Sequence, residues 1–244
     1  MKITVIGAGS WGTALAIHFS LHGHPVSIWA RNREQMAAMQ NERENQRYLP
    51  GFPLPDNLTA HTELTEALEG GELVLMVTSV AGLRDSVELI KQAGYGHLPI
   101  LTACKGFELD TGLLTFQVVR EILPDNDKIG VLSGPSFAQE LAQQLPCAVT
   151  LASDNTAWIE PLAAALSSAV LRLYANDDIH FGEKWIVSAG LRAEYFDQYA
   201  GRANRNFVFK ANTDNHGWNF SPSLGVTYRL TPQWSLYGSY ATSF

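Results

Sequence analysis

The chain has 244 residues, of which 46% are apolar and 17% are charged, which allows one large or two ordinary domains and excludes wholesale disorder. Acidic residues outnumber basic ones by 24 to 17, and the net charge of −7 argues against non-specific binding of nucleic acid or of an anionic membrane. Cys104 and Cys147 form no CxxC pair and the seven histidines form no ligand pattern, so we expect neither a disulfide scaffold nor a metal site.

The first residues show no targeting signal. Met1 and Lys2 lead directly into a short apolar run that ends at a glycine, which is unlike a signal peptide. No run of about 18 apolar residues occurs, so no membrane-spanning helix is expected. We therefore expect a cytoplasmic protein that does not associate with a membrane.

The composition of the chain changes after Asp178. Residues 1–178 carry 11 basic and 20 acidic side chains, whereas residues 179–244 carry 6 and 4. The first part holds 11 aromatic residues, and the much shorter second part holds 14. Two domains are therefore expected, one at 1–178 and the other at 179–244.

Apolar runs alternate with segments of helical periodicity in the first part. Strands are predicted at 3–6, 25–29, 73–77, 100–103, 130–132, 148–151 and 171–174. Helices are predicted at 13–20, 34–45, 64–68, 83–93, 113–122, 137–144 and 157–166, and a Pro- and Gly-rich loop at 49–55. This alternation favours an α/β fold, with a doubly wound parallel (Rossmann) sheet covered by helices on both faces.

The second part has a period of two instead. Apolar and polar residues alternate over 185–195 and 224–230, and strand character resumes over 234–241 after a short turn. The polar, Asn-rich stretch 196–220 is expected to be a long loop. The sequence therefore predicts that a short antiparallel β tail follows the Rossmann sheet.

A GxGxxG motif follows the first predicted strand and opens the first predicted helix, at Gly7-Ala8-Gly9-Ser10-Trp11-Gly12. In this context Gly7 permits a tight turn, Gly9 lets the backbone approach a pyrophosphate, and Gly12 allows the helix to pack closely on the strand. The N–H groups of Ser10 and Trp11 would meet the phosphate charge. A glycine-rich turn without a ligand is the alternative to this dinucleotide site.

The second predicted strand ends without the carboxylate that usually accepts the ribose 2′-hydroxyl of NAD. Arg31 and Arg33 stand there instead, and their charge suits a 2′-phosphate. This favours NADP as the cofactor. The alternative is a solvated surface arginine, so the choice between NADP and NAD stays open.

Two further turns follow predicted strands, at the edge where doubly wound sheets bind ligands. Lys105 is either a point charge for a phosphate or substrate oxygen, or a solvated loop lysine. Gly134 and Ser136 belong to a small-residue turn before a predicted helix. Ser136 either caps that helix or offers its hydroxyl and N–H to a bound oxygen.

Four segments occur in a characteristic order: the glycine motif within 6–16, Arg43-Glu44-Asn45 with Tyr48-Leu49-Pro50-Gly51, Lys105-Gly106-Phe107-Glu108, and Leu132-Ser133-Gly134-Pro135-Ser136-Phe137-Ala138. Together they resemble bacterial NAD(P)-dependent sn-glycerol-3-phosphate dehydrogenase over residues 1 to about 178. The resemblance implies reversible hydride transfer between NAD(P) and glycerol 3-phosphate or dihydroxyacetone phosphate, in glycerophospholipid biosynthesis. It implies dinucleotide contacts at Ser10, Trp11, Arg31, Lys105 and Ala138, beside the three glycines. It implies substrate contacts at Lys105, Gly134 and Ser136.

The sequence departs from that family in two places. Val77-Thr78-Ser79 stands where the family usually has a Val-Pro-Ser-type stretch. After Asp178 the family continues into a helical substrate domain, which opens with a segment whose lysine acts as general base, and this chain shows neither. No catalytic residue is therefore assigned, and the chain is expected to be catalytically impaired.

The tail resembles strands of a TonB-dependent siderophore receptor barrel, at 184–192, 221–232 and 234–240. About three such strands cannot close a barrel, which needs at least about eight. We hypothesise a composite reading frame, in which a truncated dehydrogenase is joined near residue 178 to a receptor fragment. The unpaired strand edges of such a tail favour self-association.

Two alternatives to the dehydrogenase interpretation remain. The first is another NADP-binding two-domain reductase, of the hydroxyacid or ketopantoate type, against which the Gly134-Pro135-Ser136 segment argues. The second is a non-enzymatic fragment of a TonB-dependent receptor, with the N-terminal part incidental.

Overall fold

The computed structural model describes residues 1–134, 137–168, 171–175, 177–181, 185–198, 215–229 and 235–241, with side chains as far as Leu171. The chain forms two compact units, Met1–Ala175 and Asn176–Phe244. Among the described helices, none combines the length and the apolar character needed to cross a bilayer.

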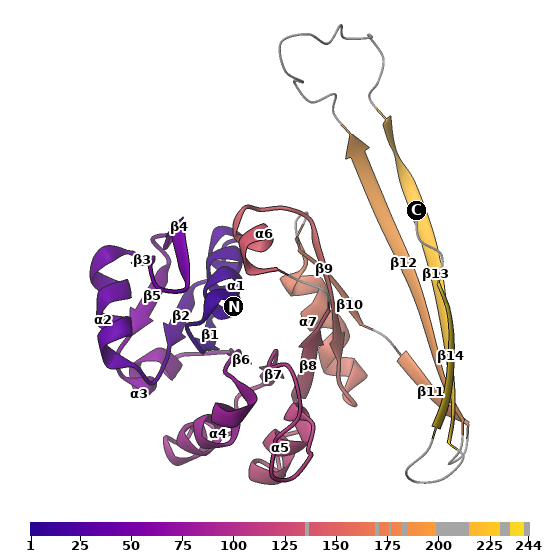
Figure 1. The fold of residues 1–244 in the computed structure, drawn as a ribbon, viewed down its shortest axis with the longest axis horizontal. Coiled ribbons are helices and arrows are strands. Elements are labelled where there is room, and N and C mark those ends of the chain that lie inside the picture. The colour runs from indigo at the N-terminus through magenta and orange to yellow at the C-terminus, as the bar shows by residue number, and fades with distance from the viewer. Residues whose placement is uncertain are drawn as a thin grey trace, which may run out of the picture. The chain divides into compact units, whose positions relative to one another are not determined.

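The first unit is built on an eight-stranded sheet with the strand order β10-β9-β8-β7-β6-β1-β2-β5 (Figure 1). Neighbouring strands from β5 to β8 run parallel. The strands are β1 (Ile3–Ile6), β2 (Val26–Trp29), β5 (Leu58–His61), β6 (Leu73–Met76), β7 (Ile100–Thr102), β8 (Ile129–Ser133), β9 (Cys147–Ala152) and β10 (Leu171–Ala175). Because β1 lies in the middle of the sheet, all four of its residues are buried. The predicted doubly wound α/β sheet is confirmed.

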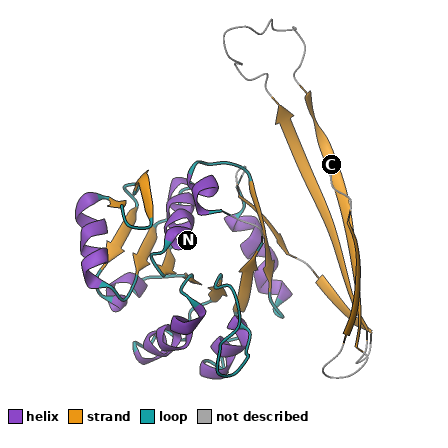
Figure 2. Cartoon of the chain, viewed as in Figure 1, coloured by secondary structure: helices purple, strands orange, loops and turns teal. Residues whose placement is uncertain are grey.

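Helices cover the sheet on both faces (Figure 2). They are α1 (Ser10–Leu21), α2 (Arg33–Glu42), α3 (Leu64–Leu68), α4 (Leu83–Gln92), α5 (Thr115–Ile122), α6 (Ala138–Ala142) and α7 (Thr156–Leu166), with a 3-10 turn at Val80–Gly82. Residues of α1, α2, α6 and α7 join one buried apolar cluster, and residues of α3, α4 and α5 join a second. The sheet therefore separates two cores.

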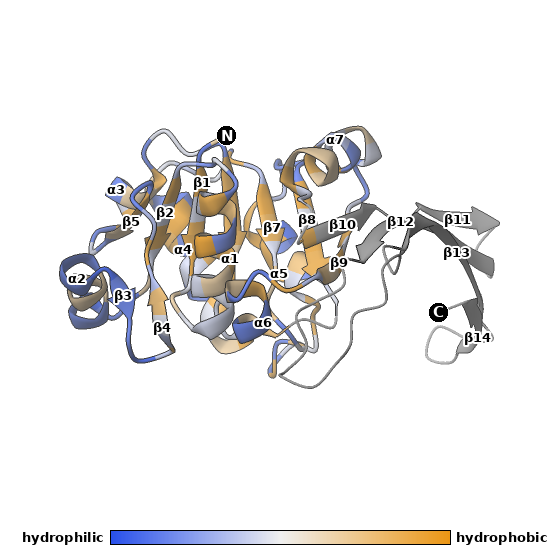
Figure 3. Cartoon of the chain, turned by 90° about the horizontal axis from the view of Figure 1, so that it is seen from above, coloured by the Kyte–Doolittle hydropathy of each residue, from blue (hydrophilic) through white to orange (hydrophobic). Residues whose placement is uncertain are grey.

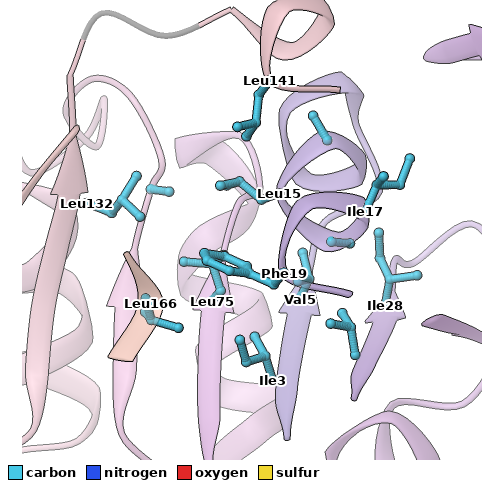
Figure 4. Close-up of a cluster of buried hydrophobic side chains, with 14 of the residues drawn as sticks. Ile3, Val5, Leu15, Ile17, Phe19, Ile28, Leu75, Leu132, Leu141 and Leu166 are labelled. Carbon is cyan, nitrogen blue, oxygen red and sulfur yellow. The ribbon is translucent and has the colours of Figure 1, made fainter. Parts of the chain in front are cut away.

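The strands supply both cores because successive side chains point to opposite faces. Ile3 and Val5 belong to the first cluster, whereas Ile6 belongs to the second. In Figure 4, Leu15 and Phe19 of α1 lie against the strand residues of the first cluster. Hydrophobic residues are concentrated on the central strands in Figure 3. The glycine turn therefore follows a strand whose residues are all fully buried.

The sheet departs from the parallel arrangement at one edge. Strand β9 runs antiparallel to β8, and β10 runs parallel to β9. A parallel connection needs a crossover long enough to return to the other end of the sheet. Between β8 and β9 lies only the five-residue helix α6, which packs against α1, and β9 enters the sheet in the opposite direction.

The segment 43–61 also differs from the prediction. Helix α2 ends at Glu42 rather than at residue 45, because Arg43 adopts a left-handed φ of 54°. Strand β3 (Glu44–Asn45) then pairs antiparallel with β4 (Leu49–Pro53), within the stretch that was predicted to be loop. Its prolines are tolerated because this ribbon has only two strands. Strand β5, which the sequence analysis did not predict, follows.

The second unit is an antiparallel sheet with the order β11-β12-β13-β14. Its strands are β11 (Asp177–Phe181), β12 (Trp185–Gln198), β13 (Asn215–Arg229) and β14 (Ser235–Ala241). The predicted antiparallel tail is confirmed. The predicted loop at 196–220 is wrong at both ends, because the β12–β13 ladder continues to the pair Gln198↔Asn215. Backbone groups make that ladder, so polar side chains do not end it. Residues 199–214 lie outside the described residues.

Candidate functional site

Two glycines hold the turn between β1 and α1 in a tight conformation. Gly7 has a φ of +120°, and a Cβ on it would lie 2.5 Å from the Val77 carbonyl oxygen. A Cβ on Gly12 would lie 2.0 Å from the Gly7 carbonyl oxygen. No side chain fits at either position without moving backbone, so the first turn of α1 packs directly on the end of the strand.

Gly9 lies between them and differs from both. A Cβ on Gly9 would meet no atom within 4 Å. In the part of the chain that the structure describes, the Gly9 N–H has no hydrogen-bond partner, whereas the Gly9 carbonyl accepts from the Thr13 N–H at 3.0 Å. The backbone at Gly9 is therefore open on the side where an anionic group would approach, and it fits a diphosphate there.

A cavity of about 300 Å³ lies at the carboxyl ends of β1, β2 and β6. Gly7, Gly9 and Arg31, three of the residues selected from the sequence, lie in its wall. The other lining residues are Ala8, Trp29, Ala30, Gln35, Tyr48, Val77, Thr78, Ser79 and Ser86. The ends of parallel strands in doubly wound sheets are where such folds bind ligands.

Ser10 and Trp11 open helix α1 next to this cavity. The Ser10 hydroxyl donates to the Tyr48 carbonyl at 2.6 Å, so this side chain ties the helix start to the β3–β4 ribbon. The Trp11 ring is half-buried against the first apolar cluster. The first turn of α1 contains no acidic residue, which leaves its N–H groups and dipole available to an anion.

Arg31 follows β2 and is held only weakly. Its Nη1 lies 3.5 Å from the Asp85 carboxylate, and the two side chains are 60% and 64% exposed. Exposed pairs at this distance contribute little, so the guanidinium can exchange Asp85 for another anion. Its Nη2 lies close to Gly82, where a Cβ would stand 3.1 Å from it. A glycine at this position thus leaves room for the guanidinium.

Lys105 follows β7 on an exposed loop, and among the described residues it has no ion-pair partner. The loop itself is fixed by Glu108, which accepts from Arg84 Nε at 2.9 Å and from Nη2 at 2.8 Å. Hydrogen bonds from Arg84, and then from Thr111, lower the pKa of Glu108 to about 2. An anchored loop therefore carries a cation at the carboxyl edge of the sheet.

The remaining residues selected from the sequence lie farther along this edge. Gly134 follows β8 with a φ of +155°, and its Cβ would lie 3.0 Å from the Ala148 carbonyl. Ala138 begins α6, which packs against α1. Ser136 lies outside the described residues. Lys105, Gly134 and Ala138 do not line the cavity at the glycine turn.

Several residues that the structure places at the site were not among those predicted from the sequence. Gln35 and Thr78 line the cavity, and Asn45 lies behind the glycine turn. Thr78 Oγ1 lies 3.6 Å from the sulfur of Cys104, whose pKa is raised by burial. Asn45 belongs to a motif of the resembling family, but Gln35 carries no sequence signal. Among the described residues, no group of three or more potential ligands could hold a metal ion.

The geometry agrees with comparisons to known proteins. Residues 2–159 match the family described as the NAD-dependent glycerol-3-phosphate dehydrogenase N-terminus. The chain belongs to this family. Residues 148–244 match a second family, described as the TonB dependent receptor-like β-barrel, and the two matches overlap at 148–159.

Individual relatives agree with the assignment. The chain is 67% identical over 179 residues to a glycerol-3-phosphate dehydrogenase (NAD(P)+) of Neisseria gonorrhoeae and 48% identical over 179 residues to one of Nitrosomonas eutropha. Each alignment covers 73% of this chain and 54% of the relative, so the chain spans about half the length of the curated relatives it matches.

Solved structures give the same result. The fold matches the crystal structure of glycerol-3-phosphate dehydrogenase from Coxiella burnetii with a TM-score of 0.68 and 35% identity, over 73% of this chain and 54% of that one. It matches the enzyme of Saccharomyces cerevisiae with a TM-score of 0.63 and 25% identity, over 73% and 57%.

Proposed function

We propose that residues 1–178 form a domain that binds NADP(H) or NAD(H) with its diphosphate on the glycine turn. The observation that carries the proposal is the contrast among the three glycines. A Cβ on Gly7 or Gly12 would collide with neighbouring backbone, whereas among the described residues a Cβ on Gly9 would meet no atom within 4 Å and the Gly9 N–H has no partner. Packing within the turn requires glycine at positions 7 and 12 but does not explain the glycine at position 9, whereas the close approach of a diphosphate does.

Each residue at the turn has a role in this proposal. The N–H groups of Gly9, Ser10 and Trp11 donate to the diphosphate at the start of α1. Arg31 leaves its weak pair with Asp85 to bind a ribose 2′-phosphate, which favours NADP over NAD. Lys105 and Ala138, on the neighbouring turns, contact the dinucleotide.

The reaction proposed for the family fold is reversible hydride transfer between the dinucleotide and glycerol 3-phosphate or dihydroxyacetone phosphate. The bound nicotinamide would supply or accept the hydride. Lys105, Gly134 and Ser136 would contact the substrate, with Lys105 attracting its phosphate or polarising its oxygen. The role proposed for Ser136 rests only on its position in the family motif.

These 244 residues are proposed to be catalytically impaired. Hydride transfer needs a base against the substrate hydroxyl and a closed, dry site. The described residues after Asp178 form β-strands, and the sequence there contains no segment like the one that carries the family's general-base lysine. Purified chain is therefore expected to show turnover near zero. Steady formation of NADPH that depends on glycerol 3-phosphate would contradict this.

Cofactor titration tests the binding proposal. Trp29 lines the cavity and Trp11 lies at the start of α1, so quenching of tryptophan fluorescence reports occupancy. The whole chain and residues 1–178 are titrated with NADPH and with NADH. Equal affinities of the two proteins, with NADPH binding tighter than NADH, are expected. Absence of binding at millimolar concentrations of both would overturn the proposal.

The tail has a separate origin in this proposal. We infer that residues 179–244 derive from a TonB-dependent receptor fragment joined to the dehydrogenase domain near residue 178, a view favoured by the match at 148–244 and by the change in composition. Its strand edges favour self-association. An uninterrupted natural gene across the junction in source DNA would contradict the idea. The competing interpretation is that the chain is a non-enzymatic fragment of a TonB-dependent receptor. It predicts that protein recovered from the cytosol binds no coenzyme.

A further inference from the structure

The peptide group between Ala8 and Gly9 is held by two side-chain amides. The Ala8 carbonyl oxygen accepts from Gln35 Nε2 at 2.7 Å and from Asn45 Nδ2 at 3.0 Å. Gln35 comes from α2 and Asn45 from β3, so two elements beyond the turn reach the same atom. Two donors on one carbonyl fix the plane of that peptide as well as its position.

The Asn45 side chain is held in a single orientation by burial and by its hydrogen bonds. Its side chain is 1% exposed, and Nδ2 makes a second hydrogen bond to Thr13 Oγ1 at 2.7 Å. Its Oδ1 accepts from the Tyr48 N–H at 3.3 Å. Both donors and the acceptor of the amide are therefore used, and the side chain is fixed in one orientation.

The direction of the Gly9 N–H follows from covalent geometry. The described backbone has no cis peptide bond, and in a trans peptide the N–H points opposite to the preceding carbonyl. When the Ala8 carbonyl is tied to Asn45 and Gln35, the Gly9 N–H must point the other way. In that direction the Gly9 N–H meets no hydrogen-bond partner among the described residues, so it is free to donate to a ligand.

We propose that Asn45 and Gln35 are positioning residues that aim the Gly9 N–H at the diphosphate of the bound dinucleotide. Without them the peptide can rotate, since glycine on its C-terminal side imposes little restriction. The N–H would then be available to the anion for only part of the time, and affinity would fall by that fraction. This inference rests on the proposed function, because it concerns how the same turn holds its ligand.

The test compares two asparagines with matched hydrogen bonds. Asn126 Nδ2 donates to the Gly96 and Leu98 carbonyls at 2.9 and 2.8 Å, and its Oδ1 accepts from the Lys128 N–H at 2.9 Å. It serves a turn before β7, at the opposite end of the strands from the cavity. The variants Asn45→Ala and Asn126→Ala are made in the whole chain, and coenzyme Kd is measured below the Tm of each.

The expected result is a coenzyme Kd roughly five- to tenfold higher in Asn45→Ala, as for partial loss of a hydrogen bond to a charged group, with Asn126→Ala within about twofold of wild type. In competition with the coenzyme, 2′-AMP, which has no diphosphate, should bind Asn45→Ala as it binds wild type. Gln35→Met, at a half-buried position, should raise the coenzyme Kd by a smaller factor. This variant replaces Asn45→Ala in the test if Asn45→Ala does not fold.

Three results have distinct meanings. If wild type binds neither coenzyme, the proposed function fails. If wild type binds but folded Asn45→Ala or Gln35→Met binds equally well, the positioning role is wrong and the proposed function stands. If Asn126→Ala loses as much affinity as Asn45→Ala, or 2′-AMP is weakened as much as the coenzyme, the effect is general loosening and the positioning role is again wrong.

Discussion

The two units of this chain are ordered in different ways. In Met1–Ala175, strands that are neighbours in space are often far apart in sequence, and helices from both faces bury two apolar clusters. In Asn176–Phe244, the described strands form an antiparallel meander in which each is paired with the next in sequence. Only the first arrangement brings the ends of distant strands together. This difference explains why every residue proposed to contact coenzyme or substrate falls in the first unit.

The largest expected effect comes from closing the first turn of α1. Gly12→Ala places a methyl group 2.0 Å from the Gly7 carbonyl oxygen, and we expect the first unit to lose more than about 3 kcal/mol of unfolding free energy together with coenzyme binding. Urea denaturation measures the first quantity. Gly23→Ala is the control, because Gly23 has a positive φ of 87° but open space, and it should cost about 1 kcal/mol. Similar losses of unfolding free energy in the two variants would contradict the claim that close packing against the Gly7 carbonyl requires glycine at position 12.

The next effect concerns the choice of coenzyme. Arg31→Gln should raise the Kd of NADPH about tenfold or more, as for loss of a charge-assisted hydrogen bond, and should change that of NADH little. Asp85→Asn removes the competing carboxylate at 3.5 Å and should tighten NADPH slightly. Equal loss of both coenzymes in Arg31→Gln would assign Arg31 a role other than contact with a 2′-phosphate.

A smaller effect is expected from the anchor of the Lys105 loop. Glu108→Gln should lower the unfolding free energy by about 1 kcal/mol at pH 7, since the Glu108 carboxylate is 13% exposed and bonded to Arg84. The pKa of Glu108 is depressed from 4.5 to about 2 in the fold, so its contribution is complete above pH 4.5 and is lost as pH falls towards 2. Urea titrations of wild type and Glu108→Gln should therefore converge on acidification. A difference that grows at low pH would contradict the assigned ion pair.

The smallest effect is expected from removing the second unit. A chain ending at residue 178 should bind coenzyme within about twofold of the whole chain, because no residue after 178 enters the proposed site. Fluorescence titration of the two proteins makes the comparison. Loss of binding on truncation would mean that the two units share the site.

Much of the first unit could be predicted because its signals are local. The run Ile3–Ile6 followed by the glycine motif identified the strand, the turn and the helix together. The reversal of β9 could not be predicted, because it depends on how short α6 is and on where it packs. The β3–β4 ribbon could not be predicted, because its prolines are typical of a loop and because the sequence does not show that Arg43 adopts a left-handed backbone conformation.

The candidate site was predictable where backbone chemistry dictates residue type. Gly7 and Gly9 were selected for conformational reasons, and both line the cavity. Gln35 and Asn45 were not, because the spacing between a helical glutamine, a strand asparagine and one carbonyl oxygen exists only in the folded chain.

The measurement that tests the central claim most directly is coenzyme binding to Gly9→Ala. The φ of Gly9 is −79°, which any residue adopts, and its Cβ would meet no protein atom within 4 Å, so the variant should keep the Tm of wild type. The new methyl group would occupy the space through which the diphosphate approaches the backbone. We predict a Kd for NADPH at least about tenfold higher than wild type at unchanged Tm. Equal binding by the two proteins would contradict the account.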